Sequence, residues 1–221
     1  MADPNSRAGV RYADAAIVRF CDATHATPDA ALASAFTAPR RENMPSIMVG
    51  LSEGQLLGLF ARLVRAQRVV EVGTLAGFSA ITLARGMTDD GHLWTIEHDP
   101  KHATVARGNI AAAGLAHRIT VVEGDGVDCL ARLEEHGPFD MVFVDADKAR
   151  YDQYGRWARA HLREGGLLLM DNAYLFGRLM ESSPAAGAMR RAHEEAAAHF
   201  HSVCIPTPDG LLLGIKRPQT R

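Results

Sequence analysis

The 221-residue sequence has few cysteines, no long apolar run and no excess of charge of either sign. Its three cysteines, Cys21, Cys129 and Cys204, are far apart and lack a CxxC spacing. This pattern disfavours a disulfide frame or a zinc site and predicts a cytoplasmic protein. No stretch approaches the roughly 20 apolar residues that a membrane span requires, so no membrane partner is predicted. The net charge of −2 is spread along the chain and gives no electrostatic support for a nucleic-acid partner.

Two familiar motifs are also missing. The ten histidines include a cluster at His193–His201, HEEAAAHFH, but position 197 is alanine, so the HExxH zinc motif is absent. His193 and His199 fall on different faces of a helix, which favours solvated side chains over metal ligands. The sequence also lacks a complete G-x-G-x-x-G fingerprint and any internal repeat.

The composition predicts one globular domain over residues 1–221, because 47% hydrophobic and 23% charged residues suit a single sizeable core. Residues 1–50 predict short helices over Tyr12–Cys21 and Pro28–Phe36. A loop then follows between Pro39 and Pro45, and we expect the segment Arg40–Met48 to act as a substrate lid. Residues 51–221 predict the α/β core.

Short apolar runs alternate with amphipathic segments from about residue 52 onward. The predicted strands are Arg68–Gly73, Leu93–Glu97, Ile119–Gly124, Phe139–Asp145 and Gly166–Asp171. The predicted helices between them are Phe78–Arg85, Pro100–Ala113, Val127–His136 and Tyr151–Leu162. Such alternation predicts a doubly wound, mostly parallel α/β sheet. Two further strands flank Thr207–Gly210 as an antiparallel C-terminal hairpin, which gives seven strands in all.

Carboxylates stand at the ends of four of the five predicted parallel strands. In an open α/β sheet these ends form the ligand-binding edge. Several acids that meet in a half-dry crevice repel one another, and a cationic ligand or a metal relieves that repulsion. The strand-end residues are Glu71, Gly73, Glu97, Gly124, Asp125, Gly126, Asp145, Asp171 and Asn172.

The loop after the first strand reads V-E-V-G-T-L-A-G-F-S. It contains Gly73 and Gly77, but Leu75 replaces the second fingerprint glycine, so close approach of a pyrophosphate is poorly supported. Glu97 lies 24 positions after Gly73 (97 − 73), near the spacing of an acid that binds ribose hydroxyls. S-adenosylmethionine, with an adenosine and two cationic groups but no phosphate, meets both conditions. The alternative is an ordinary strand-turn-helix glycine pair.

The segment Leu167–Tyr174, LLLMDNAY, ends a buried strand in a carboxylate and an amide. Asp145 ends the preceding strand, and consecutive strands joined by a helical crossover are expected to be neighbours about 5 Å apart. Asp145, Asp171 and Asn172 then offer only oxygen ligands to one point. Such a set favours Mg²⁺, or alternatively Mn²⁺ or Ca²⁺.

With these residues in view, the chain from Ser52 to Lys216 resembles the cation-dependent S-adenosylmethionine O-methyltransferases of the catechol and caffeoyl-coenzyme A type. The resemblance rests on SEGQ, VVEVGTLAGFS, TIEHD, FVDADK and MDN, of which FVDADK and MDN are the specific part. It implies a Rossmann-like methyltransferase fold and a homodimer. It also implies Asp145, Asp171 and Asn172 as metal ligands and Lys148 as general base. The implied cofactor contacts are Val49, Glu71, Gly73, Thr74, Ser79, Glu97, Gly126, Asp145 and Asp147.

The resemblance implies a small-molecule methyl acceptor whose hydroxyl has an oxygen neighbour, because both oxygens are expected to reach the metal. A catechol satisfies this, and so does an α-hydroxyacyl or hydroxymalonyl unit on a carrier. We expect Met44 and Met48 of the lid and Tyr174 and Phe176 after the MDN motif to shape the acceptor pocket. Plant members of the family carry tryptophan after MDN, so the aromatic residues here disfavour a plant-type caffeoyl-coenzyme A acceptor.

Four alternatives stay open at the level of sequence. Lys148 can be read as a solvated first-turn residue, and Arg40 and Arg41 either meet an anionic substrate or face solvent. A nucleotide-dependent oxidoreductase would use the same sheet, but the glycine loop and the MDN motif argue against it. A non-catalytic cofactor-binding module would not need the metal set together with Lys148.

Overall fold

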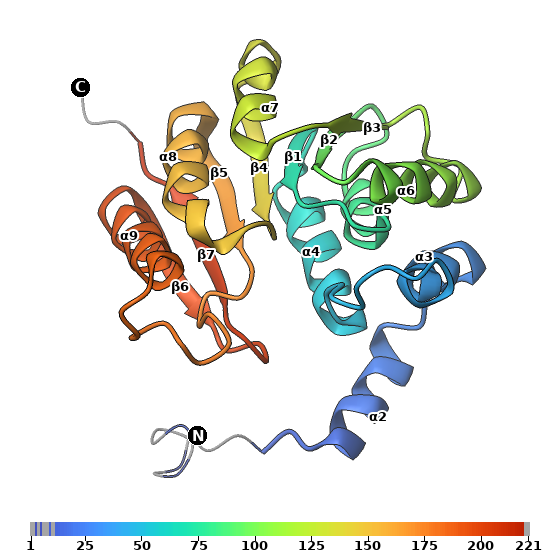
Figure 1. Ribbon diagram of the computed structural model, residues 1–221, viewed down its shortest axis with the longest axis horizontal. Helices are drawn as coiled ribbons and strands as arrows, with labels where there is room; N and C mark the ends of the chain where they lie inside the picture. The colour runs from blue at the N-terminus through green and yellow to red at the C-terminus, as the bar shows by residue number, and fades with distance from the viewer. Residues whose placement is uncertain (1–2, 4, 6–8, 10–11, 219–221) are drawn as a thin grey trace.

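Seven strands form one twisted sheet in the order β3-β2-β1-β4-β5-β7-β6 (Figure 1). The computed structural model describes residues 3, 5, 9 and 12–218. The strands are β1 Arg68–Val72, β2 His92–Glu97, β3 Ile119–Glu123, β4 Phe139–Val144, β5 Leu162–Met170, β6 Phe200–Ile205 and β7 Leu211–Lys216. β1 to β5 pair in parallel, whereas β7 runs antiparallel to both β5 and β6. The predicted doubly wound sheet with a C-terminal hairpin is confirmed.

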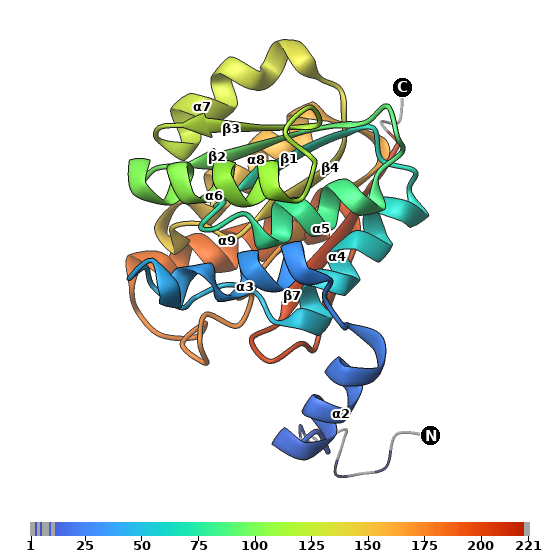
Figure 2. The same ribbon diagram turned by 90° about the vertical axis from the view of Figure 1, so that its right-hand side faces the viewer.

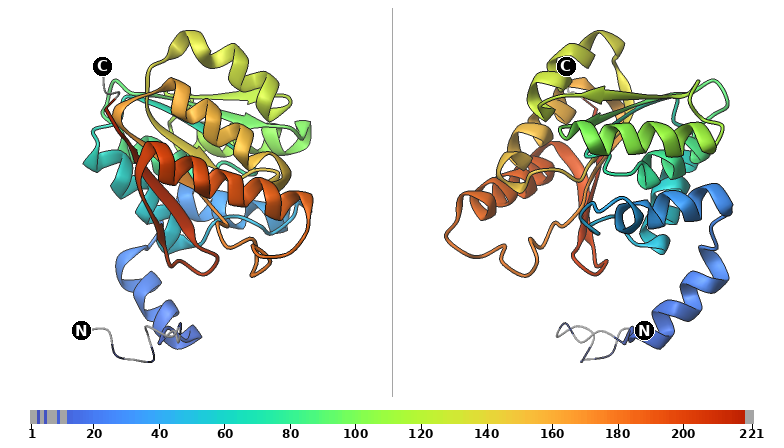
Figure 3. Two further views of the ribbon diagram at one scale, coloured as in Figure 1. Left: turned by 90° about the vertical axis from the view of Figure 1, so that its left-hand side faces the viewer. Right: turned by 45° about the vertical axis from the view of Figure 1, so that its right-hand side comes forward.

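Helices cover both faces of this sheet. The described helices are α2 Ala15–His25, α3 Ala30–Arg41, α4 Leu51–Leu63, α5 Phe78–Gly86, α6 Pro100–Ala112, α7 Gly126–Leu133, α8 Tyr151–His161 and α9 Pro184–His199, with 3-10 turns η1 Glu134–His136 and η2 Lys148–Arg150. α4, α5 and α6 pack on one face and α7, α8 and α9 on the other (Figures 2 and 3). Two hydrophobic clusters therefore sandwich the sheet.

Strand β1 shows why the sequence forms a buried parallel strand. Val69 joins the cluster under α4 and α5, whereas Val70 and Val72 join the opposite cluster under α7 and α8. Successive side chains of a strand point to opposite faces, and a parallel strand covered on both sides needs apolar residues at nearly every position. Glu71 is the exception, and it is fully buried.

The predicted boundaries of the N-terminal helices are wrong. α2 begins after Asp14, whose side chain accepts hydrogen bonds from the amides of Ala16 and Ile17, and it runs on to His25. α3 continues through Pro39 to Arg41, although the sequence pattern ended it at Phe36. A proline in the last turn removes only one backbone hydrogen bond, so the helix tolerates it. The loop between Pro39 and Pro45 is correspondingly shorter than predicted.

α2 projects away from the sheet and buries none of its residues (Figures 1 and 2). Phe20 is 70% exposed, and Ile17 and Val18 are nearly half exposed. None of the described helices is both long and apolar enough to cross a bilayer. The outermost residues of the predicted single domain, 1–2 and 219–221, lie outside the described chain.

Candidate active site

A cavity of about 860 Å³ opens at the carboxyl ends of β1, β2, β4 and β5. This is the edge at which open α/β sheets bind ligands. Of the residues predicted to form a site, the cavity wall includes Met48, Val49, Gly73, Thr74, Ser79, Glu97, Gly126, Asp145, Asp147, Lys148, Asp171, Asn172 and Phe176. Glu71, Met44 and Tyr174 lie outside that wall.

The first loop brings the backbone of β1 against that of β4. Gly73 has φ +102°, and a Cβ atom built on it would lie 2.0 Å from the carbonyl oxygen of Asp145. Gly77, with φ +85°, precedes the first residue of α5. Glycine is therefore required at position 73 both by its backbone conformation and by this close approach.

Gly73→Ala is expected to destabilise the protein by about 1–3 kcal/mol, because the new methyl group must displace the backbone of Asp145. Urea unfolding monitored by circular dichroism measures the change. Gly108→Ala is the matched control: its added methyl group meets nothing within 4 Å. Since Gly108 lies inside α6, that variant should be slightly more stable than the parent. Equal stability of Gly73→Ala and the parent would contradict the close approach.

Glu71 lies behind the wall of the cavity, on the α5 side of β1. Its Oε2 accepts a hydrogen bond of 2.5 Å from the Thr95 hydroxyl, which itself lies 2.5 Å from the hydroxyl of Thr74. The other oxygen, Oε1, has no hydrogen-bond partner in the described chain. Burial raises the pKa of Glu71 to about 8, and the neighbouring Ser79 and Thr95 hydroxyls offset this only in part. Glu71 is thus a buried acid that forms no ion pair with a Lys, Arg or His side chain among residues 12–218.

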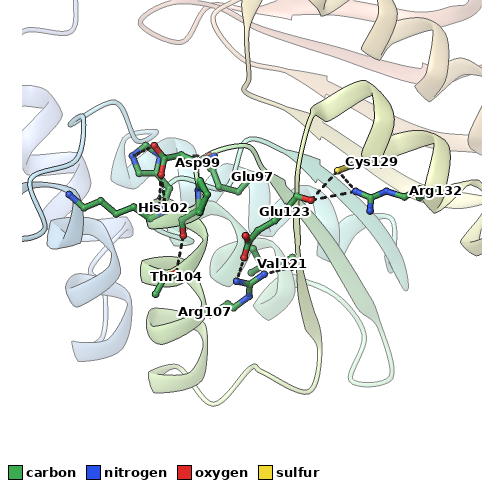
Figure 4. Close-up of polar contacts among 11 residues, drawn as sticks. Glu97, Asp99, His102, Thr104, Arg107, Val121, Glu123, Cys129 and Arg132 are labelled. Carbon is green, nitrogen blue, oxygen red and sulfur yellow. Dashed lines mark hydrogen bonds and ion pairs between the residues drawn. The ribbon is translucent and has the colours of Figure 1, made fainter.

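Glu97, at the end of β2, is held by backbone amides. Its Oε2 accepts from the amide of Leu75 at 2.8 Å and its Oε1 accepts from the amide of Asp99 at 2.9 Å. The His102 ring lies between Glu97 and Asp99, with Nδ1 3.7 Å from Glu97 Oε1 (Figure 4). A carboxylate has about four acceptor positions, so Glu97 keeps capacity for two further donors such as ribose hydroxyls.

The ends of β4 and β5 bring the predicted metal ligands together. The Asp145 amide donates to the Val72 carbonyl, and the Asp171 amide donates to the Val144 carbonyl, so the parallel ladder extends one residue past each strand. Burial, and then the neighbouring Asp145 carboxylate, raise the pKa of Asp171 to about 7. Asn172 has φ +52° and lines the same wall.

This donor set fits a hard divalent cation. Two carboxylates and one amide supply only oxygens, and the raised pKa of Asp171 shows a negative charge that the protein alone leaves poorly compensated. No group of three or more His, Cys, Asp or Glu side chains within the described ranges is arranged to bind a metal. The predicted site has two such side chains and depends on the amide of Asn172 for its third oxygen.

Lys148 is fixed between two partners. Its Nζ donates to Asp145 Oδ1 at 2.9 Å and to the Tyr151 hydroxyl at 2.6 Å, and it lies 4.7 Å from the centre of the Tyr151 ring. Tyr151 is fully buried and donates in turn to the Val144 carbonyl. The ammonium group is therefore held at the cavity wall rather than solvated.

Asp147 belongs to a second network that the sequence analysis missed. Arg150 donates to Asp147 at 2.7 Å and to both carboxylate oxygens of Asp125. The Tyr154 hydroxyl also donates to Asp147. The i, i+3 spacing between Asp147 and Arg150 was a signal for one of these contacts. No local sequence pattern predicts the contact between Arg150 and Asp125, which lie 25 residues apart.

The acceptor end of the cavity differs in part from the prediction. Met48 and Phe176 line it, and the Phe176 residue is 60% exposed. Met44 instead packs in a small buried cluster with Ala38 and Ala76, and the Tyr174 ring packs on Gly210. The sequence analysis did not place Glu53, Pro208 or Asp209 in the site, although all three line the cavity.

Comparison with known proteins identifies the family. The model of the O-methyltransferase family matches residues 25–217. The chain belongs to the O-methyltransferase family. A catechol O-methyltransferase of Niastella koreensis is 38% identical over 199 residues, which cover 85% of this chain and 90% of the relative. A catechol O-methyltransferase of Mycobacterium tuberculosis is 43% identical over 170 residues, covering 77% of each protein.

Solved structures of O-methyltransferases agree with this assignment. An O-methyltransferase of Bacillus cereus in complex with SAH has a TM-score of 0.87 at 30% identity, covering 91% of this chain and 97% of that structure. The TomG O-methyltransferase of Streptomyces achromogenes, in complex with SAM, has a TM-score of 0.86 at 33% identity, covering 92% and 96%. The resemblance drawn from the sequence is confirmed, and the enzyme is an S-adenosylmethionine-dependent O-methyltransferase.

Proposed function

We propose that this O-methyltransferase uses a divalent cation and methylates a hydroxyl group that has a second oxygen beside it. The observation that carries this proposal is the meeting of Asp145, Asp171 and Asn172 with Lys148 on one wall of the cavity. A cofactor-binding module would not need these four side chains together. A catechol-type small molecule is the acceptor that fits this arrangement best.

Asp145, Asp171 and Asn172 are the residues that would hold the cation, Mg²⁺ by preference and Mn²⁺ or Ca²⁺ otherwise. When bound there, it would lower the pKa of the acceptor hydroxyl and orient the two acceptor oxygens. The protein contributes the ladder of β1, β4 and β5, which fixes the two carboxylates side by side. The left-handed backbone of Asn172 turns the chain out of the sheet at the third ligand.

S-adenosylmethionine, which supplies the methyl group, would bind in the same cavity. The remaining predicted contacts to it are Val49, Gly73, Thr74, Ser79, Glu97, Gly126 and Asp147. Glu71, also predicted as a cofactor contact, lies behind the wall, and its role toward the cofactor stays a prediction. The wall carries many more acids than bases, which suits a cofactor with a sulfonium and an ammonium. Apart from Asp209, whose carboxylate is bound to the Phe176 amide, the acids are Glu53, Glu97, Asp125, Asp145, Asp147 and Asp171; the Lys and Arg side chains are Lys148 and Arg150.

Lys148 is the group that would accept the proton of the acceptor hydroxyl. Its bonds to Asp145 and the buried Tyr151 hold Nζ beside the metal ligands. To accept that proton, Lys148 must be in its neutral amine form. The hydroxyl oxygen would then bond to the methyl carbon of S-adenosylmethionine as the bond from that carbon to sulfur breaks, so that S-adenosylhomocysteine leaves and no covalent enzyme intermediate forms.

Charge and shape favour a catechol over a carrier-bound acceptor. Ile47, Met48, Phe176 and Pro208 give the acceptor end an apolar rim on which an aromatic ring can pack. The lysine and the arginine of the wall, Lys148 and Arg150, are ion-paired with aspartates. A polyanionic coenzyme A thioester or phosphopantetheine carrier would gain little there. Relatives at 38% and 43% identity are named catechol O-methyltransferases.

Methyl transfer from labelled S-adenosylmethionine to a matched pair of acceptors tests this specificity. Caffeic acid has two adjacent hydroxyls, and p-coumaric acid has one. We expect caffeic acid to be methylated at least about 100-fold faster, because only it offers two oxygens to the cation. Equal rates would contradict the need for a neighbouring oxygen. An α-hydroxyacyl thioester serves as the alternative acceptor. If it is methylated faster than caffeic acid, the natural acceptor is a carrier-bound substrate.

Three further features stay predictions. We propose a homodimer in which the exposed apolar side of α2, with Ile17, Val18 and Phe20, contributes to the interface. Segment 46–49, at the end of the predicted lid, would cover the acceptor. Residues 1–221 would form a single domain. A cytoplasmic location rests on the unpaired cysteines.

A further inference from the structure

The loop that follows the predicted metal ligands has an unfavourable backbone. Asn172, Leu175 and Phe176 have φ values of +52°, +53° and +54°, and Gly177 follows at +77°. Residues other than glycine rarely adopt this left-handed region, and two in succession persist only where surrounding contacts impose them. Something outside the loop must therefore hold it in this shape.

The turn between β6 and β7 provides that hold. Both carboxylate oxygens of Asp209 accept from the amide of Phe176, at 2.8 and 3.1 Å. The Asp209 carbonyl accepts from the amide of Tyr174, and the Gly210 carbonyl accepts from the amide of Ala173. Three amides of the loop are thus bound by two consecutive residues of the hairpin turn.

Side-chain packing reinforces the same contact. A Cβ atom on Gly210 would lie 2.8 Å from the Tyr174 ring, so that ring rests directly on the turn. Leu175 is buried, whereas Phe176 is turned outward and lines the cavity together with Pro208 and Asp209. The turn and the loop therefore form one wall of the acceptor end.

We propose that Asp209 is a positioning residue for the methyl acceptor. Its carboxylate fixes the backbone of Phe176, and through it places the aromatic ring at the rim of the cavity, next to Asn172. The position of this ring decides how an acceptor ring lies and which of two adjacent hydroxyls faces Lys148. Asp209 would thus control acceptor affinity and regiochemistry while leaving cofactor binding alone. This inference rests on the proposed function, since it assumes an acceptor with two adjacent oxygens.

The first test concerns the hydrogen bonds from the Phe176 amide to the Asp209 carboxylate, called the clamp below, and it needs no acceptor. In Asp209→Ala, hydrogen exchange of the peptide covering residues 172–178 is expected to rise about tenfold or more, because a charge-assisted bond is lost. Asp209→Asn keeps one carbonyl oxygen as acceptor and should restore part of the protection. Asp89→Ala, an exposed aspartate at the opposite end of the strands, is the matched control. Unchanged exchange in Asp209→Ala would overturn the clamp while leaving the proposed function intact.

The second test concerns the acceptor. Asp209→Ala is expected to raise the KM for a catechol about tenfold and to change the ratio of the two monomethyl isomers, with the Kd for S-adenosylmethionine within about twofold of the parent. Phe176→Ala should have similar effects, and the double variant should be no worse than either one. Additive effects, or an unchanged isomer ratio, would overturn the positioning role. A parent enzyme that methylates no acceptor with adjacent oxygens would instead overturn the proposed function.

Discussion

Lys148→Ala is expected to lower kcat by about 10³-fold, within the range of about 10²–10⁴ observed for loss of a general base. The reason is geometric. Nζ lies 2.9 Å from Asp145 and 2.6 Å from the Tyr151 hydroxyl, so it sits beside the predicted metal ligands where the acceptor hydroxyl must lose its proton. Steady-state kinetics with labelled S-adenosylmethionine and saturating catechol measure the change.

Three variants make this result specific to proton transfer. Lys148→Arg keeps a positive charge but cannot release its proton at neutral pH, so it should be nearly as impaired as alanine. Tyr151→Phe removes the hydroxyl that holds Nζ and should cause a smaller loss. Lys101→Ala, on the surface of α6, is the matched control and should retain parental kcat. A Lys148→Ala enzyme within about tenfold of the parent would refute the role of Lys148 as base.

Glu71→Gln is expected to stabilise the cofactor-free protein at alkaline pH, although it changes a fully buried residue. The folded-state pKa of Glu71 is about 8, above its ordinary value of 4.5. The folded protein therefore binds a proton that the unfolded chain has already released. The proton bound to Glu71 stabilises the folded protein. Its contribution to the free energy of unfolding is fully present below about pH 4.5 and is lost as the pH rises through about 8.

Above pH 8 the parent protein must bury an ionised carboxylate, whereas the glutamine of the variant stays neutral. The expected gain in the free energy of unfolding is on the order of 3–5 kcal/mol at pH 9 and close to zero at pH 4.5. Urea unfolding at both pH values measures it. Glu135→Gln, which changes an exposed glutamate, should show no such dependence. A Glu71→Gln protein less stable than the parent at pH 9 would mean that a cation or a further donor compensates the carboxylate.

Much of the site could be predicted because strand ends define it. Asp145 and Asp171 end two consecutive strands, and consecutive strands joined by a helical crossover usually lie side by side in a parallel sheet, so the topology predicts their proximity. Gly73 and Glu97 could be predicted as cofactor-binding residues because they stand at the ends of the first two strands. These residues need only the local pattern and the topology of a parallel sheet.

Other residues depend on contacts that no local pattern encodes. Asp209 reaches Phe176 across 33 residues, because β7 inserts beside β5 and carries its turn against the loop after Asp171. The same insertion draws Tyr174 onto Gly210 and away from the cavity, where the sequence had placed it. Met44 was misplaced for a similar reason: it fills a gap between α3 and the glycine loop.

We propose that methyl transfer requires a divalent cation held by Asp145, Asp171 and Asn172. The direct measurement is the rate of catechol methylation by the parent enzyme and by Asp171→Ala, first in excess EDTA and then after addition of Mg²⁺. We expect EDTA to lower the parental rate at least about 100-fold and Mg²⁺ to restore it, whereas Asp171→Ala should be inactive in both conditions. Undiminished methylation in EDTA would contradict the metal site and the mechanism built on it.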